Sequence, residues 1–306
     1  MTAEPAQVWA DLPDDTRAAL LARSNRAGLM HLAGHLGLIV ILATYVGLGL
    51  PLWGLVLLPL GILQVFLFTL QHECTHQTPF RSPSLNEVVG HLCGLILIQP
   101  FGWFRAFHMA HHRFTNDPAR DPELQGDAKP ETRRELVWHL GTLGYWAAKG
   151  QTLWHNARGQ TEGYISPRAA PRIRREAWAM LAAYAAAVLF TIFVSTILIW
   201  VWLIPLALGF PILRLYLLAE HGRCPQVANM FLNSRTTRTT RVVNWLAWNM
   251  PYHAEHHAYP QVPFHQLPQV HARVAPHLGA ITDGYSTFTQ DYVRSLNGTA
   301  GGASLP

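Results

Sequence analysis

Long apolar segments alternate with polar ones along this chain. The stretches Ala27–His72 and Ala177–Leu213 contain no Asp, Glu, Lys or Arg. A helix that crosses a bilayer needs about 20 apolar residues, so each stretch is long enough for two crossings. Gly49 and Pro51 in the first stretch and Pro205 in the second favour a reversal of the chain. The pattern therefore predicts four transmembrane helices, at about residues 29–48, 52–71, 178–202 and 204–220.

A further apolar segment, at about residues 88–104, is short for a crossing and is interrupted by Pro100 and by glycines. Such a segment is typical of a re-entrant or interfacial element. A full crossing would place His108 on the opposite side of the membrane from His76, whereas a re-entrant segment keeps them together. With four crossings, both termini lie on one side. Basic residues gather between Arg105 and Glu176, and positive charge marks cytoplasmic loops, so we expect this side to be cytoplasmic.

Composition strengthens this interpretation. Half of the 306 residues are hydrophobic and 13% are charged, the latter about half of the usual share in a soluble domain. The net charge of +5 fits topology-setting basic loops better than nucleic-acid binding, because no basic patch is interleaved with stacking aromatics. The three cysteines are scattered, which argues against a disulfide framework and an iron–sulfur cluster.

The predicted fold is an all-α integral membrane protein of one domain. We expect four transmembrane helices, the re-entrant segment, and a cytoplasmic helical cap that holds a histidine-rich site for two metal ions. Residues 1–28 would form a cytoplasmic N-terminal segment, and residues 29–296 the membrane domain. Residues 297–306, which are rich in Gly and Ala, would form a disordered tail. The bacterial inner membrane is the expected location.

Three clusters of histidines stand beside the ends of these apolar segments. They occur as H-E-C-T-H, H-M-A-H-H and H-A-E-H-H, and on a helix the i, i+3 and i+4 positions share one face. Imidazole is the commonest metal ligand. Together with a histidine at the end of the fourth span, the candidate ligands are His72, His76, His108, His111, His112, His221, His253, His256 and His257. His31 and His35 have no third partner, so we expect them to be packing residues.

So many imidazoles exceed the four ligands of a tetrahedral zinc ion. They suit two metal ions with four or five ligands each. Iron in a nitrogen-rich site with open positions activates dioxygen. The neighbouring apolar helices would bring a hydrophobic substrate to it.

With these motifs, the chain resembles the membrane fatty acid desaturase superfamily. The three histidine boxes have its order and spacing, and the flanking sequences H-H-R-F-T-N and H-H-A-Y-P-Q-V-P-F-H-Q-L-P are similar as well. The resemblance covers Leu29–Val274, and the run N-M-P-Y-H-A-E-H-H is especially similar to bacterial members, some linked to rhizopine catabolism. In the last histidine box, the sequence is also similar to those of sphingolipid desaturases and beta-carotene ketolases.

The resemblance implies a non-haem diiron centre held by the box histidines, with His221 as an additional ligand. Some acyl-CoA desaturases have an asparagine four residues before that histidine, and here the residue is Leu217. We expect Glu73, Glu220 and Glu255 to contact ligands or form salt bridges rather than to bind iron. The residues expected to orient the ligand imidazoles are Asp117, Asp121, Asn249 and Glu255. A plain structural role in the loop stays open for the two aspartates.

The implied enzyme is an O2-dependent oxidoreductase. Two electrons and O2 would let the diiron centre remove hydrogen from an unactivated C–H bond of an acyl chain or acyl lipid, and loss of a second hydrogen gives an alkene. The chain carries no dinucleotide-binding glycine motif, so the electrons must come from a partner. A ferredoxin, or a cytochrome with its reductase, is the expected donor.

Other functions remain open at this point. The same ligands would serve a hydroxylase or ketolase of a lipid, a carotenoid or another small hydrophobic molecule. A membrane zinc hydrolase needs fewer histidines. A non-enzymatic metal-binding protein or transporter would place its ligands at mid-membrane, whereas these boxes lie at the ends of spans.

Overall fold

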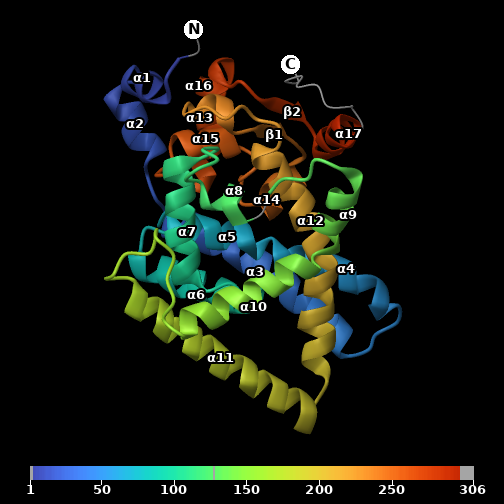
Figure 1. The fold of residues 1–306 in the computed structure, drawn as a ribbon. Coiled ribbons are helices and arrows are strands. Elements are labelled where there is room, and N and C mark those ends of the chain that lie inside the picture. Colours follow the sequence, from blue (N-terminus) through green and yellow to red (C-terminus); the bar gives the residue numbers. More distant parts are fainter. Residues whose placement is uncertain (1–2, 127, 297–306) are drawn as a thin grey trace.

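The computed structural model describes residues 3–126 and 128–296, and most of them are helical (Figure 1). Within these residues, four helical segments are long and apolar enough to cross a membrane. Their bounds are Asp14–Gly47, Trp53–Thr75, Ala170–Phe193 and Ile199–His221. The prediction of four helices of membrane length is therefore confirmed, although the boundaries differ. The predicted tail, residues 297–306, lies outside the described residues.

The first two spans form a hairpin. Two short helices, α1 (Pro5–Ala10) and α2 (Asp14–Leu20), precede α3 (Asn25–Gly47). The Ser24 hydroxyl accepts a hydrogen bond from the Ala27 N–H, which satisfies a free donor at the start of α3. After the turn at Gly49, where φ is +60°, the chain returns as α4 (Trp53–Val65). It continues as α5 (Leu67–Thr75), which carries the first histidine box at the end of the span.

The third span begins earlier in the chain than the pattern predicts. Helix α11 (Ala170–Phe193) has Pro171 in its first turn, where proline suits a helix, and so it extends ahead of the apolar run. It ends at Phe193, and the Ser195 hydroxyl then accepts a hydrogen bond from the Ile197 N–H. A π-helical turn, η1 (Ile199–Leu203), leads into α12 (Ile204–His221).

Helices α4 and α12 approach each other closely through two glycines. A β-carbon on Gly61 would overlap the carbonyl oxygen of Pro205, and one on Gly209 would overlap the carbonyl oxygen of Gly61. Small residues allow helix backbones to approach within a membrane. This contact fixes the position of α12, whose last residue is His221.

A sharp bend separates α6 (Pro83–Leu97) from α7 (Phe101–Phe114), and their axes differ by 100°. Pro100 precedes α7 directly. The Glu176 carboxylate from α11 accepts hydrogen bonds from the Phe101 and Gly102 N–H groups, at 2.6 and 2.8 Å. A negative charge at a helix N-terminus also complements the helix dipole. The predicted segment 88–104 covers this bend, and its re-entrant path stays a prediction.

Most of the remaining elements form a cap beside the spans, whereas α10 (Leu143–Ala157) lies along α11 (Figure 1). The cap includes one small parallel sheet, in which Thr236 pairs with Ile281 and Arg238 with Asp283. The all-α prediction is wrong in this detail, because two strands of three residues are too short to show an alternating pattern. The remaining elements are α8 (Pro122–Gly126), α9 (Arg133–Gly141), α10 (Leu143–Ala157), α13 (Met230–Asn233), β1 (Thr236–Arg238), α14 (Arg241–Leu246), α15 (His253–Ala258), η2 (Phe264–Gln266), α16 (Leu267–Val274), η3 (Ala275–His277), β2 (Ile281–Asp283) and α17 (Tyr285–Ser295).

One apolar core joins the spans to the cap. Its buried side chains include Leu70 of α5, Phe101 of α7, Phe210 of α12 and Trp248, which follows α14. Helices α1 and α17 lie at the same end of the molecule, with α1 near α13 and α16 and α17 beside β2 (Figure 1). The two ends of the described chain therefore both lie by the cap.

We expect Gly61→Ala to destabilise the fold by about 1–3 kcal/mol, the usual cost of overpacking a close contact. Gly54→Ala is the control, because a β-carbon there meets nothing within 4 Å. The measurement is the Tm of each purified variant in detergent. Equal Tm values for the two variants would contradict the close packing of α4 against α12.

Candidate dimetal site

Four helices bring the predicted histidines together. Helix α5 contains His72, and His76 follows its last residue. Helix α12 ends at His221. Helix α7 and helix α15 each hold an H-x-x-H-H motif in helical conformation, so the three histidines of each motif share one face. Those histidines are His108, His111, His112, His253, His256 and His257.

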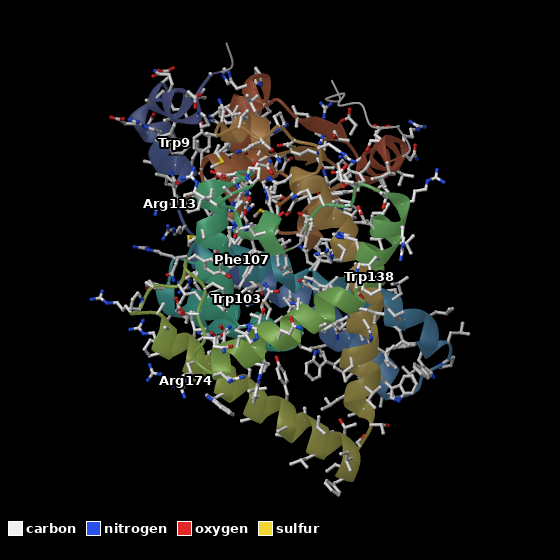
Figure 2. All side chains as sticks on the ribbon, viewed as in Figure 1. Trp9, Trp103, Phe107, Arg113, Trp138 and Arg174 are labelled. Atoms are coloured by element: carbon white, nitrogen blue, oxygen red, sulfur yellow. The ribbon has the colours of Figure 1, made fainter. Side chains whose placement is uncertain are left out.

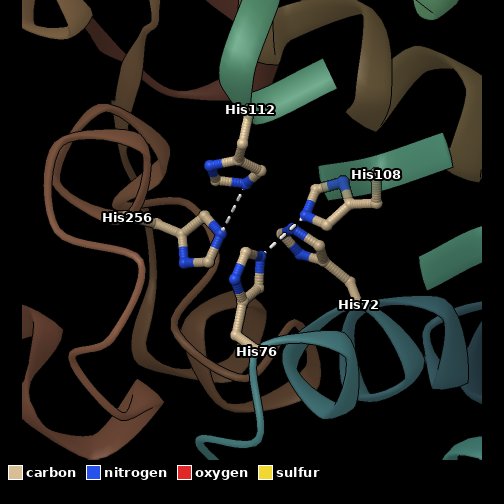
Figure 3. Close-up of side chains that lie close together, drawn as sticks. All are labelled: His72, His76, His108, His112 and His256. Carbon is tan, nitrogen blue, oxygen red and sulfur yellow. Dashed lines mark hydrogen bonds between the residues drawn. The ribbon is translucent and has the colours of Figure 1, made fainter. Parts of the chain in front are cut away.

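The histidines form two groups. In the first cluster, one nitrogen from each of five rings lies within 4.8 Å of the others. Figure 3 shows the five rings pointing toward one another. The Nε2 atoms of His76 and His108 are 2.8 Å apart, and those of His256 and His112 are 3.2 Å apart. The members of the first cluster are His72, His76, His108, His112 and His256.

The second cluster adjoins the first along α7 and α15. His111, His221 and His257 place one nitrogen each within 4.8 Å of one another. The Nε2 atom of His221 lies 3.2 Å from that of His111 and 3.0 Å from that of His253. We therefore include His253 in the second cluster, which gives it four imidazoles.

The imidazole nitrogens of both clusters are better suited to binding metal ions than to hydrogen bonding with one another. A neutral imidazole has one N–H, and its other nitrogen is an acceptor. Burial, and then the neighbouring imidazoles, hold the pKa of His253, His256 and His257 well below the usual value, so these rings are neutral. The buried Nε2 atoms of His72 and His257 have no hydrogen-bond partner among the described residues. Converging lone pairs of this kind are a donor set for two cations.

Three of the four rings in the second cluster have a hydrogen-bond partner at the outward Nδ1 atom. The His111 Nδ1 is 2.9 Å from the Asp121 carboxylate, and the His221 Nδ1 is 3.1 Å from the Asn233 carbonyl oxygen. The His257 Nδ1 is 3.2 Å from the Thr115 hydroxyl. Such partners fix the tautomer, so that Nε2 presents its lone pair to the site.

Two carboxylates, the buried Glu73 and the partly buried Glu220, lie somewhat further from ligand rings. Glu220 is 3.4 Å from the His253 Nδ1, and Glu73 is 3.5 Å from the His256 Nδ1. Glu73 also accepts a hydrogen bond from the Thr78 hydroxyl at 2.8 Å. Both carboxylates therefore lie beside the Nδ1 atom of an imidazole, on the side away from its Nε2 atom.

Three predicted orienting residues have other partners. Asp117 pairs with Arg120, and the Asn249 side chain donates to the Phe264 carbonyl oxygen at 3.0 Å. Glu255 accepts a hydrogen bond from Thr236 at 2.5 Å and pairs with His271. Of the four residues, the structure places only Asp121 against a ligand candidate.

Sequence reasoning missed Thr115 and Asn233. Thr115 follows His111 by four residues, and its hydroxyl also donates to the His111 carbonyl oxygen at 2.8 Å. On a helix, residues four apart lie on the same face, so this spacing could have indicated that Thr115 lies near the ligand histidines. Asn233 acts through its backbone carbonyl, which any residue possesses, so its identity carried no signal. His31 and His35 lie outside both clusters, and their Nε2 atoms bond to the Trp245 and Leu63 carbonyl oxygens.

A cavity of about 460 Å³ opens beside both clusters. Its wall includes His72 and His108 of the first cluster and His111 and His253 of the second. Aromatic side chains from α5 and α7 line the adjoining wall: Phe68, Trp103, Phe104 and Phe107. Trp103 and Phe107 come from successive turns of α7 and stack at 5.2 Å (Figure 2). The cavity can thus bring a carbon skeleton to the histidines.

Membrane-length helices and a buried site with two histidine clusters that could hold metal ions define the class of an integral membrane protein. The model of the family "Fatty acid desaturase" matches residues 48–289, and the chain belongs to that family.

Similar proteins include desaturases of several kinds. Dihydrorhizobitoxine desaturase of Bradyrhizobium elkanii is 26% identical over 230 residues, which cover 70% of this chain and 65% of the relative. The sn-1 oleoyl-lipid 12-desaturase of Picosynechococcus is 37% identical over 86 residues, 26% of this chain and 24% of the relative. The sphingolipid delta(4)-desaturase DES1 of Drosophila melanogaster is 27% identical over 69% of this chain and 62% of the relative. The matches thus span less than two thirds of these relatives.

We expect Asp121→Asn to weaken metal binding by about tenfold or more, because the His111 ring loses its charged acceptor. Asp117→Asn is the control, since Asp117 lies in the same loop and pairs with Arg120. The measurement is bound iron per chain after dialysis against graded chelator concentrations. Equal retention of iron in the two variants would show that Asp121 has no orienting role.

Proposed function

We propose that this protein is a membrane-bound diiron enzyme that uses O2 and two electrons to desaturate an acyl chain or acyl lipid. The observation that carries the proposal is the pair of histidine clusters on the wall of one cavity. Several similar proteins are named as acyl-lipid or sphingolipid desaturases, which supports the substrate class.

The first cluster would hold one iron ion and the second cluster the other. The five imidazoles of the first cluster exceed the four ligands of tetrahedral zinc, and nine imidazoles side by side suit a pair of iron ions with open positions. When bound, the iron pair supplies the oxidising power that removes hydrogen from an unactivated C–H bond. The chain itself holds the ligand rings in place through Asp121, Thr115 and the Asn233 carbonyl.

The other contribution of the chain is to position the substrate and to exclude water. The aromatic wall formed by Phe68, Phe104 and Phe107 would hold the reacting carbons against His72 and His108. Apolar surroundings also prevent side reactions with water. No side chain needs to act as a general acid or base.

The electrons would come from a separate donor, such as a ferredoxin or a cytochrome with its reductase. One relative, from Arabidopsis thaliana, carries ferredoxin in its name, which supports a donor of this kind. An acidic donor would meet the basic segment that includes Arg133, Arg134, Arg172, Arg174 and Arg175. Figure 2 marks Arg174 near the start of α11.

Both ends of the chain, the cap and the clusters would face the cytoplasm, with residues 29–296 as one membrane domain. The even number of spans and the basic residues between 105 and 176 support this orientation. The bacterial inner membrane is the proposed location, and nucleic acid is not a proposed partner.

The test is mass spectrometry of lipids and hydrophobic metabolites from cells that express the protein with a ferredoxin and its reductase. We expect a species lighter by two hydrogens. It should be absent when His112→Ala and His256→Ala are combined, because the first cluster then loses two ligands. His155→Ala, a change of an exposed histidine outside both clusters, should retain the product. A product that gains oxygen instead would replace the desaturase proposal with a hydroxylase or ketolase.

A further inference from the structure

A buried lysine lines the same cavity as the histidines. Lys149 lies on α10 and is 7% exposed. Its ammonium group donates to the Gln99 side-chain oxygen at 2.6 Å and lies 4.8 Å from the centre of the Tyr145 ring. An ammonium group has three donors. Among the described residues, no carboxylate pairs with Lys149, so a buried cation faces the cavity with only a neutral amide as its hydrogen-bond acceptor.

The other charged side chains that line the cavity have partners of their own. Lys129 pairs with Glu123 at 2.9 Å. Of the other two glutamates on the wall, Glu162 accepts from the Trp103 indole at 3.3 Å, and Glu220 lies against His253. On the side of Lys149, Arg214 adds a second cation, over the same Tyr145 ring at 4.8 Å. Among the described residues of the wall, the carboxylates thus lie near α7 and the clusters, and none of them pairs with Lys149, which lies beside Tyr145.

Burying a cation without an anion is costly. Burial, and then the charge of Arg214, lower the pKa of Lys149 to about 7. If Lys149 served only to join α10 to Gln99, it would use one of its three donors and would need no charge. A ligand anion beside Lys149 would use the remaining donors and would favour the charged ammonium form.

Gln99 supplies a further donor. Its oxygen accepts from Lys149, and its side-chain NH2 group has no acceptor among the described residues. Its backbone carbonyl accepts from Gln71, which directly precedes His72, so Gln99 is held beside the first cluster. Lys149 and Gln99 can therefore bind the two oxygens of one carboxylate.

We propose that Lys149 and Gln99 bind a carboxylate of the substrate, so that the oxidised molecule is a compact hydrocarbon carboxylate and not the chain of an uncharged lipid. The inference rests on the proposed function for the oxidation itself. The carbon skeleton would lie along Phe68 and Phe104 towards His72 and His108. A cavity of about 460 Å³ has the size of pockets that enclose most of a small ligand.

The test compares hexanoate with 1-hexanol, which has the same carbon chain without the charge. Both are titrated by ligand-observed NMR into purified, iron-loaded protein in nanodiscs. We expect hexanoate to bind about tenfold more tightly than 1-hexanol, as a charge-assisted hydrogen bond implies. Lys149→Met should abolish this preference, and Lys149→Arg should retain part of it. Arg158→Met, which removes an exposed cation directly after α10, is the control and should leave the preference unchanged.

Equal binding of the two probes to the unchanged protein would overturn the proposal, even if Lys149→Met failed to fold. An undiminished preference for hexanoate in a folded Lys149→Met variant would also overturn it. Iron per chain is measured on the same samples. Loss of iron from all of them would count against the dimetal site, whereas the comparison of the two probes would still decide the role of Lys149.

Discussion

The convergence of imidazole nitrogens in a buried space is the constraint on which the rest of the structure depends. In the second cluster the Nε2 atom of His221 lies within 3.2 Å of two others, and neutral rings cannot all satisfy one another there. Two bound cations would remove this conflict. The contact of Gly61 with Gly209 places the end of α12, and Glu176 fixes the start of α7 after a bend of 100°. These two contacts bring α12 and α7, which both carry histidines, to the site.

Much of this arrangement could be predicted from the sequence. Charge-free stretches predict the spans, because no charged residue is stable in the bilayer core without a partner. The H-x-x-H-H spacing in α7 and α15 predicts which rings share a helix face, and the structure gathers them as two clusters. The contact of Asp121 with a ligand candidate could be predicted from the general rule that ligating histidines donate to a carboxylate.

Other parts could not be predicted, for physical reasons. Tertiary contacts decide which acceptor meets which ring, so Asn249 and Glu255 looked suitable by proximity but bond to Phe264 and Thr236 instead. The sheet of β1 and β2 is held by backbone hydrogen bonds between segments far apart in sequence. Lys149 gave no signal either, because its burial depends on Gln99, fifty residues away in the chain.

The cavity connects the two proposals. Both the histidines and Lys149 line it, so the same space would offer an oxidising centre and an anchor for an anion. The aromatic side chains of the wall suit a hydrocarbon. The histidine clusters would define the reaction, and the charge of Lys149 would define which molecules are held in position for it.

The most direct test of the central claim is anomalous X-ray scattering from crystals of the purified protein, recorded at the iron and zinc absorption edges. We expect two separate iron maxima, one among the five rings of the first cluster and one among the four rings of the second. A single maximum, or maxima at the zinc edge alone, would contradict it.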